Sequence, residues 1–188
     1  QLNAEDEGNR KYIMVQLPEE TPEDSEARKA GYDTIPEIAK ERIRRAGKKI
    51  KEESPLTTQN LDTGFRVFHL ADSNFEEVKK APGEYEQSQL DLFLNNVKSG
   101  RTDLDLLFGA MLSWGVQLSL PMISEEVDGK MIYSVNDGDL VACFADDITE
   151  NIVKAMADKQ PLRVLFRDSC FGRDDAKINV FETLKQLL

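Results

Sequence analysis

Residues 11–18 read KYIMVQLP, a short apolar segment that follows a charged N-terminal stretch and ends at a proline. An unbroken apolar run of this length is typical of a strand buried in a parallel sheet. Residues 64–70, GFRVFHL, have a similar character and predict a second strand. With the helical sequence between them, the two segments form a strand–helix–strand crossover, the unit from which parallel sheets are built.

The helix of this crossover has a start signal and an apolar stripe. Thr34 precedes Glu37 by three residues, which is the spacing of a capping box. Isoleucine and alanine residues then recur at helical spacing, so one face of the helix is expected to pack on the sheet. Thr21, directly before Pro22, is a second candidate for a helix start.

Beyond residue 85 the pattern changes to helices mixed with short strands. Helices are predicted over residues 85–97, 102–114, 147–158 and 178–188. Strands are predicted over residues 116–123, 130–135, 140–144 and 162–167. Asp128-Gly129 and Asn136-Asp137-Gly138 supply hairpin turns. The predicted fold class is therefore α/β: part of a parallel sheet in residues 1–84, followed by a smaller α+β unit in residues 85–188.

Charge is distributed unevenly along the chain. The net charge of −11 is the opposite of what a surface that grips nucleic-acid backbone requires. Seven basic residues nevertheless gather within residues 40–51. On the predicted helix they form a solvated face or contact DNA phosphates, and we favour the solvated face. They are Lys40, Arg42, Arg44, Arg45, Lys48, Lys49 and Lys51.

Several classes of protein are disfavoured by composition. No run of about 18 apolar residues exists, so no membrane span is expected. Cys143 and Cys170 are too few for a disulfide framework and suit the reducing cytoplasm. With a single histidine, they do not make a zinc cluster, so no metal site is expected. We expect both cysteines to be small core residues.

Long strings of this sequence resemble the modification (Mod) subunits of type III restriction–modification systems. The first strings are residues 8–53, from GNRKYIMVQLPEE to AGKKIKEE, and residues 61–75, LDTGFRVFHLADSNF. LSWGVQLSLP (112–121), IYSVNDGDLVACF (132–144) and PLRVLFRDSCFGRDDAKINV (161–180) follow in the order that this family uses. Their ordered succession makes the resemblance specific, and it extends over nearly the whole chain.

The resemblance implies an adenine-specific DNA methyltransferase that transfers a methyl group from S-adenosylmethionine. It further implies that residues 1–84 are the C-terminal part of a Rossmann-like methyltransferase domain. Neither the catalytic Asp-Pro-Pro-Tyr string nor a Phe-x-Gly-x-Gly cofactor loop occurs in the sequence. We therefore expect no catalytic residue in this chain, and no methylation of DNA by the chain alone.

The resemblance also places cofactor contacts. In such domains the second strand ends with a polar or acidic side chain that hydrogen-bonds the ribose hydroxyls, as in dinucleotide folds. Gln16 near the strand end and Glu19 just beyond Pro18 are the candidates. The alternative is that Gln16 is an ordinary strand-end residue and Glu19 a solvated one.

Asp72 is the third candidate cofactor residue. With Ser73 and Asn74 it follows the second predicted strand, where the wall beside the cofactor's adenine is expected. Such residues are also ordinary turn formers, and we favour that interpretation. His69 is expected to be structural.

The unit from residue 85 onward shows no cofactor or catalytic signature. The resemblance implies an assembly role there, with a second Mod subunit and a restriction (Res) subunit as partners, and DNA bound by the longer protein. The alternative function is a non-catalytic interaction module that binds a partner protein and no cofactor. The residues that form either its core or an interface are Phe108, Met111, Trp114, Leu118 and Leu120.

Overall fold

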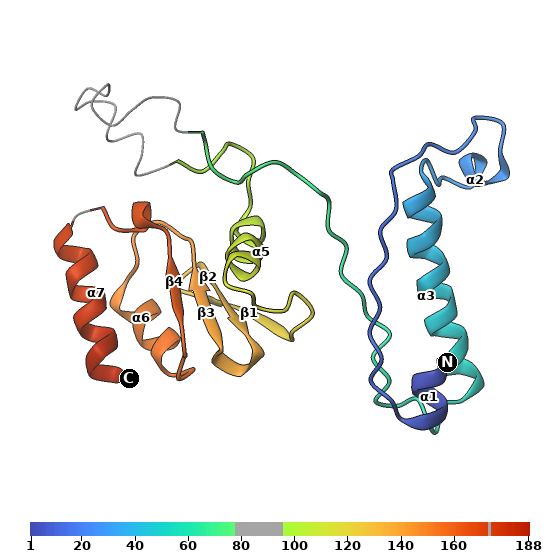
Figure 1. The fold of residues 1–188 in the computed structure, drawn as a ribbon. Coiled ribbons are helices and arrows are strands. Elements are labelled where there is room, and N and C mark those ends of the chain that lie inside the picture. The colour runs from blue at the N-terminus through green and yellow to red at the C-terminus, as the bar shows by residue number, and fades with distance from the viewer. Residues whose placement is uncertain (78–95, 173) are drawn as a thin grey trace. The chain divides into compact units, whose positions relative to one another are not determined.

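The computed structural model describes residues 1–77, 96–172 and 174–188 and divides the chain into two compact units, Gln1–Val67 and Phe68–Leu188 (Figure 1). The boundary predicted near residue 85 and nearly all of the helix predicted over 85–97 lie outside the described residues.

The unit of residues 68–188 contains a four-stranded sheet in the order β1-β2-β3-β4 (Figure 1). The strands are β1 (Met122–Val127), β2 (Lys130–Val135), β3 (Leu140–Cys143) and β4 (Val164–Phe166). β1, β2 and β3 pair antiparallel, whereas β4 runs parallel to β3. The strands predicted over 130–135, 140–144 and 162–167 are thereby confirmed.

Both predicted hairpin turns are present where their sequences require them. Asp128 and Gly129 have φ values of 53° and 75°, the left-handed backbone that a two-residue turn between β1 and β2 needs. Gly138, with a φ of 106°, ends the turn before β3, and a Cβ there would lie 2.6 Å from the carbonyl oxygen of Lys159. A side chain at position 138 would therefore push the backbone apart.

The first strand begins later than predicted. Residues 116–121 form turns, with the Val116 amide bonded to the Met111 carbonyl and the Leu120 amide to the Gln117 carbonyl. β1 starts only at Met122 and runs on to the hairpin. The apolar residues before β1 are partly buried against the core. Their alternation with polar residues therefore reflects this packing and not pairing with another strand.

Three helices cover the sheet: α5 (Asp103–Ser113), α6 (Glu150–Ala157) and α7 (Asp174–Leu187). They confirm the helices predicted over 102–114, 147–158 and 178–188, although α7 begins four residues early. Thr102 caps α5, accepting the Asp105 amide while Asp105 accepts the Thr102 amide at 2.7 Å. Thr149 caps α6 in the same way through the Ile152 amide.

The core has a layer on each face of this sheet. On one face α5 contributes Leu107 and Met111, which pack with Val135 and Leu140. On the other face α6 packs on the alternate side chains of the strands, and α7 packs on α6 (Figure 1). The order is thus helix, sheet, helix, with a further helix outside.

Both cysteines lie in this core, as predicted. Cys143 ends β3, and Cys170 follows β4. Burial raises the pKa of each thiol, so both stay protonated at neutral pH. They are inert packing groups under ordinary conditions.

The unit of residues 1–67 consists of helices and irregular chain. Its helices are α1 (Leu2–Asp6), α2 (Glu26–Lys29) and α3 (Ile35–Glu53). α3 is the predicted long helix, and the Glu37 carboxylate accepts the backbone amides of Thr34 and Asp33 as a capping box requires. The helix start predicted at Thr21 is wrong, because α2 begins after Ser25.

The two strands predicted over 11–17 and 64–70 are wrong for this structure. Both segments are irregular chain with no ladder partner, and the sheet lies in the unit of residues 68–188. Ile13 and Val15 are 94% and 92% exposed, so nothing buries the apolar run that predicted the first strand. A strand is stabilised only by its neighbours, and residues 1–67 offer this run none. The expected Rossmann-like sheet is therefore not seen.

Residues 1–67 also lack a buried apolar side chain. Thr21, Gly47 and Thr58 are their only buried residues. Gly47 permits the close approach of α3 to Thr63, whose Cβ would lie 3.0 Å from an added Cβ.

Among the residues that the structure describes, no helix has the length and apolarity needed to cross a membrane.

Candidate functional site

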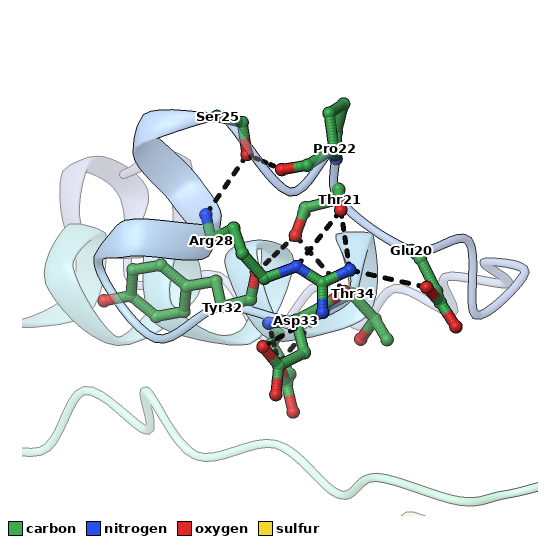
Figure 2. Close-up of polar contacts among 9 residues, drawn as sticks. Glu20, Thr21, Pro22, Ser25, Arg28, Tyr32, Asp33 and Thr34 are labelled. Carbon is green, nitrogen blue, oxygen red and sulfur yellow. Dashed lines mark hydrogen bonds and ion pairs between the residues drawn. The ribbon is translucent and has the colours of Figure 1, made fainter.

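A polar cluster of residues 1–67 closes the loop between Glu20 and Thr34 (Figure 2). The Thr21 amide donates to the Asp33 carbonyl at 2.9 Å. The Thr21 hydroxyl lies 2.7 Å from the Tyr32 carbonyl, to which it donates. Thr21 is buried to 2% exposure in a unit without an apolar core. Hydrogen bonds therefore hold this loop closed.

Arg28 is the central cation of the cluster. Its Nε and Nη2 donate to the Thr21 carbonyl at 3.1 and 2.7 Å, while Nη1 lies 3.2 Å from Asp33 Oδ1. Nη2 also reaches Glu20 Oε2 at 3.4 Å (Figure 2). We call Arg28 with Thr21, Asp33 and Glu20 the arginine clasp. A planar guanidinium suits this task because it presents several donors in one fixed fork.

The first turn of α3 fixes the backbone at Glu19, next to the clasp. The Ile35 amide, in the first turn of α3, donates to the Glu19 carbonyl at 2.9 Å. The Glu19 side chain is exposed, and no described residue donates to its carboxylate. A fixed backbone with a free carboxylate is suited to accept hydrogen bonds from a hydroxyl-bearing ligand.

Gln16 is less well positioned. Its Nε2 donates to the carbonyl of the adjacent Leu17 at 3.3 Å, and the residue is exposed. It lies in the irregular chain that was predicted as a strand. Gln16 and Glu19 thus share a segment of residues 1–67, but only Glu19 has a backbone held by the start of α3.

Asp72 lies in the other unit and is already engaged. Its two carboxylate oxygens form ion pairs with Lys98 Nζ and Arg101 Nη2, each at 2.5 Å. The hydrogen bond from Lys98, aided by its charge and by Arg101, lowers the pKa of the Asp72 carboxyl. The isolated pairing of Phe75 with Val97 ties the same two segments together. In this structure Asp72 joins residues 72–76 to residues 96–101.

Four of the seven basic residues of α3 pair with carboxylates on the helix itself. Arg44 and Arg45 pair with Glu41, and Lys48 and Lys49 pair with Glu52 and Glu53. These pairs are exposed and one helical turn apart, the usual arrangement of a solvated face. The predicted solvated face is therefore favoured over a phosphate-binding one.

The sequence did not reveal the arginine clasp. Arg28 and Asp33 stand in a polar stretch with no periodicity, and the main acceptor of Arg28 is a backbone carbonyl seven residues away. The only local signal was Ser25, which caps α2 through the Arg28 amide.

Among residues 1–77, 96–172 and 174–188, no group of three or more His, Cys, Asp or Glu side chains is placed to hold a metal ion.

Comparison with known proteins identifies the relatives of one stretch. Over 70 residues the chain is 41% identical to the StyLTI Mod subunit, a type III restriction-modification enzyme of Salmonella typhimurium. Over that stretch, the chain is a relative of type III Mod subunits. It is likewise 41% identical over 69 residues to the EcoP15I Mod subunit of Escherichia coli. No protein-family model matches the chain.

The similarity to these Mod subunits is partial on both sides. The aligned residues make up 37% of this chain and only 10% and 9% of the two relatives. The sequence therefore corresponds to a small part of each relative. The resemblance predicted from the sequence is confirmed at this level.

Substitution of Arg28 tests whether the clasp holds the loop. Arg28→Ala removes both donors to the Thr21 carbonyl, each worth about 0.5–1.5 kcal/mol, and the ion pair with the exposed Asp33, which contributes less. We expect the Thr21 amide to exchange hydrogen about tenfold faster, measured by NMR. Lys29→Ala, which removes only an exposed pair with Glu26, is the control. Equal exchange in both variants would show that Arg28 does not close the loop.

Proposed function

We propose that this chain is the C-terminal portion of a type III Mod subunit, an S-adenosylmethionine-dependent DNA methyltransferase specific for adenine. The observation that carries the proposal is the 41% identity to two Mod subunits over about 70 residues. The two Mod subunits come from different bacteria, and each has this level of sequence identity to the chain. The intact protein, which includes residues outside this chain, acts in the cytoplasm, and this chain alone is inactive.

The exposed apolar side chains of residues 1–67 support the proposal that this unit is part of a larger domain. Tyr12, Ile13, Met14, Val15 and Leu17 are all at least 59% exposed. Such a run is costly to leave in water, since each large apolar side chain gains roughly 1.5–3 kcal/mol on burial. In the intact protein we propose that this run is buried as a strand of the methyltransferase sheet.

The position of Glu19 supports a cofactor role. The start of α3 holds its backbone just beyond the apolar run, at the end of the proposed strand. In sheets of this kind, ligands bind beyond the carboxyl ends of strands. Glu19 then accepts hydrogen bonds from the ribose hydroxyls of S-adenosylmethionine, with Gln16 beside it. Asp72 is a weaker candidate, because Lys98 and Arg101 already occupy its carboxylate.

The unit of residues 68–188 is proposed to serve assembly with a second Mod subunit and with the restriction subunit. Its helices and sheet form an α/β/α core, and its described residues show no group of three or more His, Cys, Asp or Glu side chains placed to hold a metal ion. A non-catalytic interaction module remains the alternative function for the whole chain. The similarity to methyltransferase subunits favours the first proposal.

Methyl transfer by the intact protein tests the proposal. The intact protein, incubated with S-adenosylmethionine labelled in its methyl group and genomic DNA from an unrelated bacterium, is expected to label adenine. Nuclease digestion and chromatography of the nucleosides identify the acceptor base. Label on cytosine would refute adenine specificity, and no label on DNA would refute the methyltransferase proposal.

A further inference from the structure

The outer edge of β4 is open in the described part of the chain. β4 is the last strand of the sheet and pairs only with β3. The Val141 amide donates to the Arg163 carbonyl at 2.9 Å. Alternate residues of a strand direct their backbone groups to opposite sides, so this bond determines which residues of β4 face β3. The amide and carbonyl of Val164 therefore point away from β3, and they have no partner among the described residues.

A shallow hollow, wide open to solvent, lies beside this edge and is lined by Trp114, Arg163 and Val164. Trp114 ends α5 and is 46% exposed. Leu165 packs in the α5-side core, whereas Val164 packs on the α6 side. Because successive side chains alternate between the faces, Arg163 belongs to the α5 face with Trp114.

Arg163 is unusual in its unit because its charge is not neutralised. Residues 68–188 contain 21 Asp or Glu against 12 Lys or Arg, a net charge of −9. Among the described residues of this unit, Arg163 alone of the Lys and Arg side chains lacks a carboxylate or carbonyl partner. The paired ones are Lys98, Arg101, Lys130, Lys154, Lys159, Arg167, Lys177 and Lys185.

The opposite edge of the sheet is protected. β1 carries Glu125 and Glu126, and Glu125 is held by Lys159 at 2.8 Å. Charged side chains on an edge strand discourage further pairing. β4 is short and carries only Val164, Leu165 and Phe166, so the edge open to pairing is the one beside the hollow.

From these features we infer that β4 and the hollow form a docking site for an extended segment of a partner protein. The segment adds a strand at Val164 and places an acidic side chain against Arg163. An apolar side chain two residues along the same face contacts Trp114. Main-chain bonds supply affinity in such strand addition, and the alternate side chains supply specificity. One acidic residue is favoured over several, because the unit as a whole is negative.

A short peptide tests this site without knowledge of the natural partner. The probe is a fluorescein-labelled peptide ITDTIT, whose isoleucines and single aspartate lie on one face of a strand. Fluorescence polarisation with the 188-residue chain is expected to show saturable binding. The matched peptide ITKTIT, with lysine for aspartate, is expected to bind at least about tenfold more weakly, since a charge-assisted bond is lost.

Variants of the chain locate the binding. Arg163→Glu is expected to weaken ITDTIT about tenfold or more and to strengthen ITKTIT, because the charges across the site are reversed. Trp114→Ala weakens both peptides. Lys185→Glu, the same charge change on the exposed face of α7, is the control and leaves both unchanged. Circular dichroism checks that each variant is folded.

Three results would overturn the inference. They are no binding of either peptide at millimolar concentration, equal binding of the two peptides, and equal effects of Arg163→Glu and Lys185→Glu. Trp114 and Arg163 are also residue types that stack nucleobases. Binding of a single-stranded oligonucleotide at this site, with none of the peptide, would contradict it as well. The inference does not depend on methyltransferase activity, so either result stands apart from the methyl-transfer assay.

Discussion

Replacement of Leu107 by alanine is expected to lower the free energy of unfolding of residues 68–188 by about 2–5 kcal/mol. Leu107 is fully buried on the inner face of α5, against Val135 and Leu140 of the sheet. Truncation removes the transfer energy of the lost methyl groups and leaves a cavity that a close-packed core closes only in part. The helix itself is not weakened, because alanine has the highest helix propensity.

Leu104 provides a matched control for this variant. It lies on the same helix and is 40% exposed, so the same chemical change there costs less than about 1 kcal/mol. Urea denaturation followed by the fluorescence of Trp114, the single tryptophan, reports on this unit directly. Similar losses in Leu104→Ala and Leu107→Ala would contradict the assigned core.

Replacement of Glu19 by alanine in the intact protein is expected to weaken the binding of S-adenosylmethionine by about tenfold to a hundredfold. This range corresponds to loss of charge-assisted hydrogen bonds worth about 1.5–3 kcal/mol. The fold is expected to be unaffected, because only the backbone carbonyl of Glu19 takes part in the structure. Titration calorimetry gives the dissociation constant of each variant.

Glu23 serves as the control for Glu19. It is an exposed carboxylate of the loop that the clasp closes. Glu23→Ala therefore makes the same change of charge without removing the proposed ribose contact. A loss of affinity as large in Glu23→Ala as in Glu19→Ala would indicate general electrostatics in place of a specific hydrogen bond.

The fold of residues 102–188 was predictable because its signals are local. Thr102 with Asp105 starts a helix, and Asp128-Gly129 turns a hairpin wherever apolar alternation flanks it. The sequence also indicated that Cys143 and Cys170 are core residues. It did not predict that β4 lies at the edge of the sheet, since strand order depends on contacts between distant residues.

The strands predicted over 11–17 and 64–70 failed for the same physical reason. An apolar run indicates that a segment is buried somewhere, but a ladder exists only where a neighbouring strand satisfies its backbone groups. In residues 1–67 no such neighbour is present, and Ile13 and Val15 remain exposed. By contrast, α3 satisfies its own backbone and forms as predicted from Thr34 and Glu37.

The candidate site was predictable only in its chemistry. The position of Glu19 near the end of an apolar run made it a candidate. The resemblance to Mod subunits indicated the ribose of S-adenosylmethionine as its ligand. The backbone of Glu19 is held by the Ile35 amide, and the adjacent loop is closed by Arg28, which bonds to a carbonyl seven residues away. The engagement of Asp72 by Lys98 and Arg101 spans more than 25 residues and was equally invisible in the sequence.

The dissociation constant of the intact protein for S-adenosylmethionine, measured for the wild type, Glu19→Ala and Glu23→Ala together, tests the central proposal most directly. One saturable site is predicted, weakened by at least about tenfold in Glu19→Ala and unchanged in Glu23→Ala. A wild-type protein that binds no S-adenosylmethionine, or a Glu19→Ala variant that binds it as tightly as the wild type, would contradict the proposal that this segment forms part of the cofactor site.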